Sequence, residues 1–306
     1  MLKKIALLKV KNFIFYISDL IGAFHYLIKG FKPREGLTVL CYHSTADKLP
    51  RFSPYNPYNV TLETFAKQIK IIKKATLLKV VDTFFLTDKD FKGTYCLWIT
   101  FDDGYMCNMR AAELLKENKL KATFFICTDY IDTEYFNFSR FDSWCKDNIQ
   151  KEWYLPMSLD NLRELSRMGF DIQSHGCSHR SLGHLSYEEI NHELSSSKEF
   201  FERELSRKVI AMSYPFGSSY LGNVIHPTKE ALLKNQYSIG CTTDAGYNTW
   251  ENFKQDKLGL KRIPVNSWDR GITFQAKING YSGLLHFLKF VLHKFLKGGK
   301  RQIDYR

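Results

Sequence analysis

The chain has 306 residues, of which 44% are hydrophobic and 25% charged, and this composition favours a globular protein with a large core. It contains no low-complexity tract and no internal repeat, which excludes fibrous and solenoid architectures. Its seven cysteines are scattered without a Cys-x-x-Cys pair. We therefore expect reduced thiols and a cytoplasmic location rather than a disulfide framework or a zinc finger.

Basic residues gather at the two ends of the chain. The net charge is +12, yet residues 35–276 hold 30 basic and 30 acidic residues. The excess lies in residues 1–34, with seven Lys or Arg against Asp19, and in residues 277–306, with seven against Asp304. This distribution predicts a basic apolar N-terminal segment, a neutral folded domain and a basic tail. A nucleic-acid-binding protein would show a basic face within its folded body, so no nucleic acid is expected as a partner.

Both terminal segments have the pattern of amphipathic helices. The C-terminal "SGLLHFLKFVLHKFLKGGK" places His and Lys on one narrow helical stripe, with Leu, Phe and Val on the rest. The N-terminal "KNFIFYISDLIGAFHYLIKG" has an apolar run that Asp19 and His25 interrupt, which makes a spanning helix or a signal peptide a poor match. Such helices either pack on the domain or lie in a membrane interface. We favour the interface, and so predict a peripheral protein that binds anionic lipid at the inner face of the membrane.

Between the two ends, apolar strands alternate with helical segments. The run "LTVLCYH" at 37–43 is typical of a buried strand, and "TLETFAKQIKIIKK" at 61–74 is typical of a helix capped by Thr61. This alternation favours a parallel α/β sheet, either open or closed into a barrel. Further strands are expected at 95–104 (running into a polar turn), 121–127, 170–174, 208–217, 238–246 and 258–265, and further helices at 105–120, 158–169 and 186–205.

Polar side chains follow several of the expected strands. In parallel α/β proteins, catalytic groups gather where strands end in loops at their carboxyl edge. One carboxylate and two imidazoles form a typical open catalytic metal site, and a second carboxylate beside the first could act as a base. His175 and His179 would share one ion if the chain turned helically after Ser174. The candidates at this edge are His43, Asp102, Asp103, His175, His179, the stretch 214–217 and Arg262.

Three motifs in order carry a family resemblance. They are "TFDDG", followed by an apolar helix and "KATFFI", then "LRELSRMGFDIQSHGCSHRSL", and then "MSYPFG". Over roughly residues 37–265 the chain resembles the polysaccharide deacetylase family, carbohydrate esterase family four. The resemblance implies a distorted (β/α) barrel and metal-dependent removal of N- or O-acetyl groups from sugars.

The resemblance also implies roles for individual residues. Asp102 would be the catalytic base. Asp103, His175 and His179 would hold a divalent metal, with Zn²⁺ the expected ion. The backbone N–H of Phe216 would help to bind the oxyanion.

Two departures from the usual family pattern affect the positioning of these groups. Many members have an arginine where this chain has Ser213, and we hypothesise that Arg262 takes its place beside Asp102. Many members also carry a late Leu-x-x-His motif that supplies the general acid, and none follows Arg262 here. The chain instead resembles the branch with Tyr-His on the first strand, which implies that His43 is the acid.

The predicted activity is therefore hydrolysis of an N-acetyl or other acyl group on a sugar residue of a polysaccharide or lipid-linked glycan. The alternative is a non-catalytic sugar-binding or assembly protein of the same fold at the membrane. The aromatic-rich insert at 130–157 either shapes the substrate groove, because sugar faces stack on such side chains, or covers the barrel as a lid.

Overall fold

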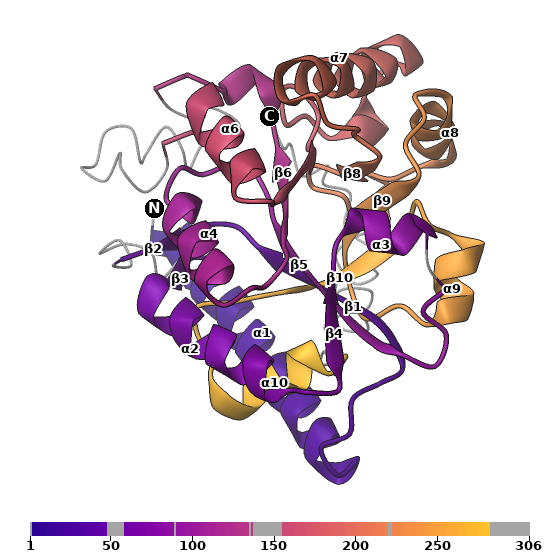
Figure 1. Cartoon of the computed structure of the whole chain (residues 1–306). Coiled ribbons are helices and arrows are strands. Elements are labelled where there is room, and N and C mark those ends of the chain that lie inside the picture. The colour runs from indigo at the N-terminus through magenta and orange to yellow at the C-terminus, as the bar shows by residue number, and fades with distance from the viewer. Residues whose placement is uncertain are drawn as a thin grey trace.

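Parallel strands and helices alternate along the part of the chain that the structure describes (Figure 1). The structure is a computed structural model that describes residues 2–47, 58–88, 90–134, 136, 155–219 and 222–281. The strands are β1 (Gly36–Tyr42), β2 (Thr45–Ala46), β3 (Val60–Thr61), β4 (Leu78–Val81), β5 (Tyr95–Phe101), β6 (Thr123–Ile126), β7 (Asp171–Ser174), β8 (Ala211–Ser213), β9 (Ile239–Ala245) and β10 (Leu260–Pro264). The helices are α1 (Leu2–Ile28), α2 (Leu62–Lys74), α3 (Thr83–Asp88), α4 (Asn108–Glu117), α6 (Leu159–Arg167), α7 (Tyr187–Leu205), α8 (His226–Lys234), α9 (Trp250–Gln255) and α10 (Gly271–Ile278), with 3-10 turns η2 (Thr128–Tyr130) and η4 (Leu182–His184).

The large sheet closes on itself. Its eight described strands run in the order β1-β10-β9-β8-β7-β6-β5-β4, and β1 also pairs with β5 over its full length. This second pairing completes a parallel ring that leaves out β4. The first half of β5 pairs with β4 and its last residues pair with β6, so β4 and β6 share one edge of β5. The predicted distorted (β/α) barrel is confirmed, and the open-sheet alternative is wrong.

Polar caps start three of the helices that the sequence predicts, α2, α6 and α7. The side chain of Thr61 accepts a hydrogen bond from the first turn of α2. Ser158 and Asn161 form a reciprocal capping box at the start of α6, and Ser186 and Glu189 form another at the start of α7. Each cap satisfies backbone N–H groups that have no partner within the helix.

Some elements differ from the sequence prediction. The strand expected at 208–217 is reduced to β8, because the chain turns away from the sheet at Tyr214 and Phe216 has a left-handed φ of 54°. The helix expected at 105–120 begins only at Asn108. Several other elements were not predicted at all. They are β2, β3, β4, α3, α8, α9 and α10.

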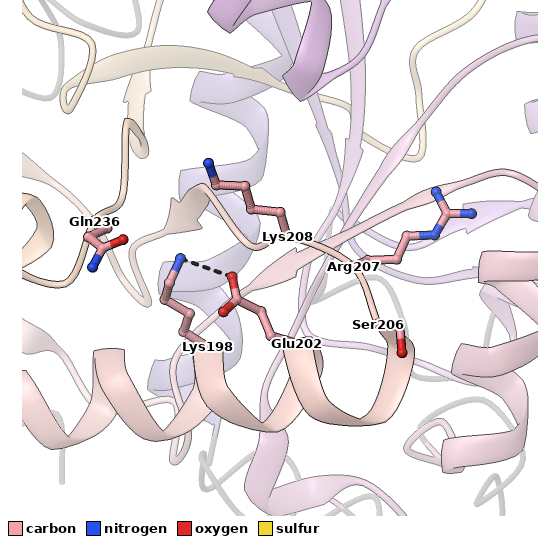
Figure 2. Close-up of a pocket in the computed structure, with 6 residues that line it drawn as sticks. All are labelled: Lys198, Glu202, Ser206, Arg207, Lys208 and Gln236. Carbon is pink, nitrogen blue, oxygen red and sulfur yellow. Dashed lines mark ion pairs between the residues drawn. The ribbon is translucent and has the colours of Figure 1, made fainter.

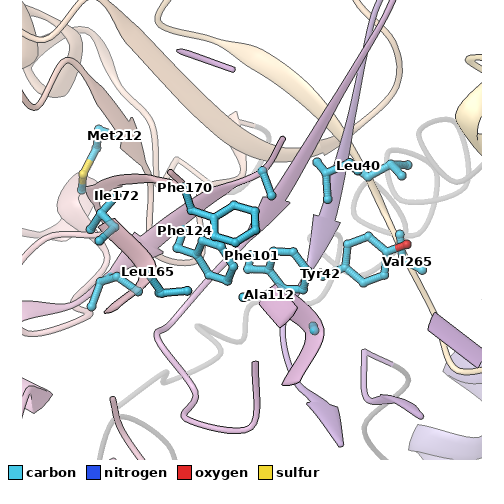
Figure 3. Close-up of a cluster of buried hydrophobic side chains, with 14 of the residues drawn as sticks. Leu40, Tyr42, Phe101, Ala112, Phe124, Leu165, Phe170, Ile172, Met212 and Val265 are labelled. Carbon is cyan, nitrogen blue, oxygen red and sulfur yellow. The ribbon is translucent and has the colours of Figure 1, made fainter. Parts of the chain in front are cut away.

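Successive side chains of a strand point to opposite faces, so those of the barrel strands pack into two different hydrophobic cores. Leu40, Phe101 and Phe124 pack between the barrel and helices α2, α4 and α6 (Figure 3). Trp98 of β5 belongs to a separate cluster on the other side of the strands. Asp102 follows β5 and lies four residues after Trp98, an even number. Its side chain is therefore on the same side of the strand as that of Trp98 and is directed into the barrel.

The N-terminal helix α1 packs along the barrel beside α10 (Figure 1). Phe15, Asp19 and Tyr26 are buried in this contact. The predicted boundary between domain and tail falls inside α10, whose Lys277 is buried 3.0 Å from Asp19. The amphipathic helix predicted after Tyr281 lies outside the described residues. Among the helices that are described, none has the length and apolar character needed to cross a membrane.

Candidate active site

The strand register brings the ends of three strands to one rim of the barrel. Tyr42, the last residue of β1, pairs with Phe101, the last residue of β5. Because these strands are parallel, His43 and Asp102 leave the sheet at the same edge. His175, which follows β7, leaves at that carboxyl edge too. This is the edge at which parallel α/β enzymes carry their catalytic groups.

A carboxylate and two imidazoles converge at this rim. Asp103 Oδ1 lies 3.3 Å from His175 Nε2 and 3.2 Å from His179 Nε2. All three side chains are buried, and one donor atom from each lies within 4.8 Å of the others. Among the described residues, no hydrogen bond of good geometry reaches the buried Asp103 Oδ1. A cation would satisfy this oxygen, so the three side chains fit a divalent ion such as Zn²⁺.

The chain between the two histidines is not helical, so the turn of helix predicted after Ser174 is wrong. Gly176 and His179 instead have left-handed φ values of 76° and 60°. Glycine suits its position because an added Cβ would lie 3.0 Å from Glu193 Oε2. These two backbone reversals, rather than a helical period, bring His179 to Asp103.

Glu193 of α7 holds this loop and was not among the predicted site residues. Its Oε2 accepts hydrogen bonds from the backbone N–H groups of Cys177 at 2.7 Å and Ser178 at 3.0 Å. Its Oε1 accepts from the Ser178 hydroxyl and from Arg180. The sequence held one signal: Glu193 lies on the buried face of α7, close to Ile190, where an acid requires a partner.

Burial and mutual contacts shift the pKa of each residue in the cluster. Burial opposes the charge of Asp103, but its contacts with the two histidines hold its pKa well below the ordinary value. Burial lowers the pKa of His179. For His175, burial also acts to lower the pKa, but the carboxylates of Asp102 and Asp103 outweigh it and the pKa is raised. His175 Nδ1 lies 2.6 Å from the Ser213 carbonyl oxygen, so it donates there and leaves Nε2 for a ligand bond.

Asp102 is paired with Arg262 inside the barrel. The guanidinium donates to Oδ1 and Oδ2 at 2.7 Å each, and the Ser213 hydroxyl donates to Oδ2 at 3.1 Å. Burial alone would raise the pKa of Asp102, but Arg262 and His175 outweigh burial and lower the pKa to about 2. The two residues whose contact was hypothesised from the sequence are therefore adjacent.

Arg262→Met is expected to lower the free energy of unfolding by about 3–5 kcal/mol, because it leaves Asp102 as a buried and unpaired carboxylate. Both side chains are at most 3% exposed, so solvent cannot screen the charge that remains. Urea unfolding followed by tryptophan fluorescence measures the change. The double variant Arg262→Met/Asp102→Asn removes both charges and should recover most of the loss. A single variant within about 1 kcal/mol of the wild type would contradict this account of the pair.

His43 and Phe216 flank the cluster. His43 stacks on Tyr58, with ring centroids 5.0 Å apart and planes inclined by 23°. His43 also belongs with Asp102 to a group of side chains whose donor atoms lie within 4.8 Å of one another. The Phe216 ring contacts the His179 ring edge-on at 4.7 Å. All the site residues predicted from the sequence therefore lie together, at the rim or just inside it.

The aromatic insert packs on the rim where it begins. Tyr130 and Phe136 are buried beside Tyr105, and the Phe136 ring centroid lies 5.2 Å and 4.9 Å from those of its two neighbours. Residues 137–154 lie outside the described part of the chain. The choice between a groove wall and a lid for the insert is therefore not tested.

A surface cavity of about 340 Å³ lies away from these residues (Figure 2). Lys208 and Gln236 in its wall precede β8 and β9, so the cavity opens at the amino edge of the barrel, opposite the candidate site. Lys198 and Glu202, both of α7, form an ion pair of 3.2 Å in its wall. Its lining consists of Lys198, Glu202, Ser206, Arg207, Lys208 and Gln236.

Comparison with known proteins agrees with this geometry. A sequence model described as polysaccharide deacetylase matches residues 89–235, a stretch that includes both aspartates and both histidines of the cluster. Over residues 89–235 the chain matches the polysaccharide deacetylase family. A similar protein in Bacillus subtilis (strain 168), YxkH, is named as a polysaccharide deacetylase. The two are 26% identical over 255 residues, which cover 82% of this chain and 78% of the relative.

Solved structures of deacetylases share the fold of this chain. Streptococcus pyogenes deacetylase PplD, in complex with acetate, has a TM-score of 0.60 and 21% identity, covering 76% of this chain and 92% of PplD. BC0361, a polysaccharide deacetylase from Bacillus cereus, has a TM-score of 0.63 and 24% identity, covering 79% of this chain and 68% of BC0361. At sequence identities of 21% and 24%, the similarity to these two structures shows a shared fold and no more. The match to the family over residues 89–235 implies a hydrolase that deacetylates carbohydrate.

Proposed function

We propose that this chain is a metal-dependent hydrolase that removes an N-acetyl or other acyl group from a sugar residue of a polysaccharide or lipid-linked glycan. The observation that carries the proposal is the convergence of Asp103, His175 and His179 beside the buried Asp102. These three residues would hold the cation, with Zn²⁺ the expected ion. When bound, such an ion polarises an acyl carbonyl and lowers the pKa of a water molecule.

Asp102 is proposed as the general base, and its contacts favour one of its two oxygens. Oδ2 accepts from Arg262 and Ser213 and faces the Cys41 thiol at 3.6 Å. Oδ1 accepts from Arg262 at 2.7 Å, and a carboxylate oxygen has two lone pairs. We assign Oδ1 to the proton of the attacking water. With a pKa of about 2, Asp102 is ionised at neutral pH but weakly basic, so it needs a water that the site has acidified.

The backbone N–H of Phe216 is proposed to stabilise the oxyanion that forms when water attacks the acyl carbon. Two observations support this role. The Phe216 ring contacts His179, and the left-handed φ of 54° makes Phe216 the point at which the chain turns after β8. A donor fixed in a turn costs little reorganisation when the negative charge develops.

His43 is proposed as the general acid, and His43→Ala is expected to slow amide hydrolysis by about 10²-fold or more, since an amine leaves poorly unless it is protonated. Activated acetyl esters should lose much less rate, because their leaving groups depart without a proton. The ratio of kcat/KM on the two substrate types measures this difference. Equal losses on both would make His43 a structural residue that stacks on Tyr58.

We also propose that the enzyme works at the cytoplasmic face of the membrane, on a lipid-linked or nascent glycan. The proposal rests on the charge of the chain, whose +12 excess lies in its two apolar ends. Anionic lipid attracts such segments, and apolar side chains that enter the interface add to the attraction.

The competing function is a sugar-binding or assembly protein that keeps the fold without catalysis. The complete set of two aspartates and two histidines favours the enzyme, because a non-catalytic protein has no need of a metal site. The test measures metal content and acetate release in one preparation. Acetate release that a chelator stops and Zn²⁺ restores supports the hydrolase, whereas a metal-free protein that binds glycan without acetate release supports the competitor.

A further inference from the structure

The outer face of α1 is apolar and open to solvent. Most of the large hydrophobic side chains that the described residues expose lie between Val10 and Phe31. Six of them recur in alternating steps of three and four residues, which places them on one helical stripe. They are Val10, Phe13, Ile17, Leu20, Phe24 and Leu27. A contiguous apolar face of this kind on a globular protein marks an interaction surface.

The opposite face of α1 is fixed to the barrel by a buried ion-pair network. Asp19 accepts hydrogen bonds from Asn266 at 3.0 Å, from Trp268 at 2.8 Å and from Lys277 at 3.0 Å. Lys277 also contacts Asp269 at 2.7 Å. These contacts determine which face of the helix is buried. They also remove from the surface the sole acidic residue of the first 34.

The exposed face therefore combines apolar side chains with positive charge. Residues 1–34 carry seven Lys or Arg, and among them Lys29 and Lys32 are exposed at the end of α1. We propose that this face docks the protein on an anionic lipid bilayer, with the apolar stripe in the interface and the basic residues at the headgroups. An apolar stripe that ends at exposed lysines and is free of exposed acid is the composition that such helices require.

A second copy of the chain fits this face less well. Two copies would bring two segments of equal positive charge together, which opposes association. Paired helices also choose their partners through complementary charges beside the apolar seam. Here the flanking positions hold Ile14, Ile21 and Ile28, so the face lacks such charges and is wider than a helix-pair seam.

The last described residue of the chain lies against this helix. The ring centroid of Tyr281, the last described residue, lies 5.3 Å from that of Tyr26 and 5.2 Å from that of His25. The chain continues from Tyr281 into a sequence with six Lys or Arg and one acid. The described chain therefore ends beside α1, at the point where the second basic apolar segment of the sequence begins.

The direction of α1 relates the docking face to the candidate site. Phe15 packs with Ala245 and Trp268, which lie at the carboxyl ends of β9 and β10. Tyr26 lies further along α1, where its hydroxyl contacts Asn279 after α10. The first half of α1 is therefore next to the catalytic rim. If the proposed deacetylase function is correct, on which this step rests, docking places the rim beside lipid-carried glycan.

The test is flotation of the full-length protein with vesicles of phosphatidylcholine alone or with phosphatidylglycerol added. The wild type should float with the anionic vesicles, and Phe13→Gln/Phe24→Gln/Ile28→Gln should reduce the bound fraction by about tenfold or more. The three side chains are 63%, 63% and 66% exposed, so the substitutions should not disturb the core. Leu77→Gln/Leu233→Gln is the matched control, since these side chains are 65% and 63% exposed away from α1 and should leave binding unchanged.

Wild-type protein that stays unbound with anionic vesicles would overturn the proposal, as would a triple variant that floats like the wild type. A wild-type dimer that the triple variant converts to a monomer, with vesicle binding unaltered, would assign the face to a second copy instead. Hydrolysis of a soluble activated acetyl ester is measured in parallel. That rate reports on the proposed function separately, because the three substituted residues lie outside the candidate site.

Discussion

Replacing Asp103, His175 or His179 with alanine is expected to remove both the bound cation and the hydrolytic activity. An open catalytic site with three protein ligands has no spare ligand, so the loss of one leaves two donors that hold the ion weakly. We expect metal content to fall to background and turnover to fall by more than about 10²-fold. Elemental analysis after dialysis measures the metal, and initial rates on an activated acetyl ester measure the activity.

His226→Ala is the matched control for the histidine variants. The His226 side chain is 91% exposed on α8, so its loss should change neither metal content nor rate. Full metal occupancy in any one of the three ligand variants would show that the ligand set is wrong. Loss of metal together with loss of cooperative unfolding would instead indicate a folding defect, so thermal denaturation accompanies each assay.

Asp102→Asn is expected to lower turnover by about 10²–10⁴-fold while the bound metal is retained. The asparagine keeps the shape of the side chain but cannot take a proton from water. It also leaves Arg262 without its anionic partner inside the barrel, so some loss of stability should accompany the loss of rate. The kcat of metal-loaded protein and its metal content, measured on the same sample, separate the two effects.

The opposite pattern in Asp102→Asn would reverse the roles of the two aspartates. If the variant loses the metal, Asp102 is a ligand. If it keeps both metal and the wild-type rate, Asp102 is not the base, and its pairing with Arg262 serves the fold alone. The comparison with Asp103→Ala then decides which carboxylate holds the ion.

The fold and the main chemistry of the site could be predicted because both depend on local patterns. Alternating strands and helices predict a parallel sheet, open or closed, and the family resemblance implies the barrel. Parallel strands place the residues that follow them at one edge. His43, Asp102 and His175 each follow a strand directly, so their meeting at one rim follows from the topology. Arg262 lies within β10, and its contact with Asp102 depends on both side chains facing the barrel interior.

Other features depend on contacts that no local pattern encodes. Asp19 interrupts an apolar run in the sequence, but in the fold it meets Lys277, which is 258 positions away. Periodicity predicts that α1 has two faces and leaves open which of them packs on the barrel. Glu193 likewise can be recognised as the residue that holds the His175–His179 loop only from its contacts with Cys177 and Ser178. The spacing of four residues between His175 and His179 is compatible with a helix and also with a bend. The left-handed backbone torsion at Gly176 shows that the chain bends there.

The central claim is that this rim deacetylates carbohydrate through the cluster of Asp103, His175 and His179. Its most direct test is acetate release from N-acetylated oligosaccharides and from an activated acetyl ester, by Zn²⁺-loaded wild type and by His175→Ala prepared identically. The account predicts acetate from the wild type, with a free amine appearing on the sugar, and none above background from the variant. Equal release by both proteins, or a metal-loaded wild type that hydrolyses neither the amides nor the ester, would contradict it.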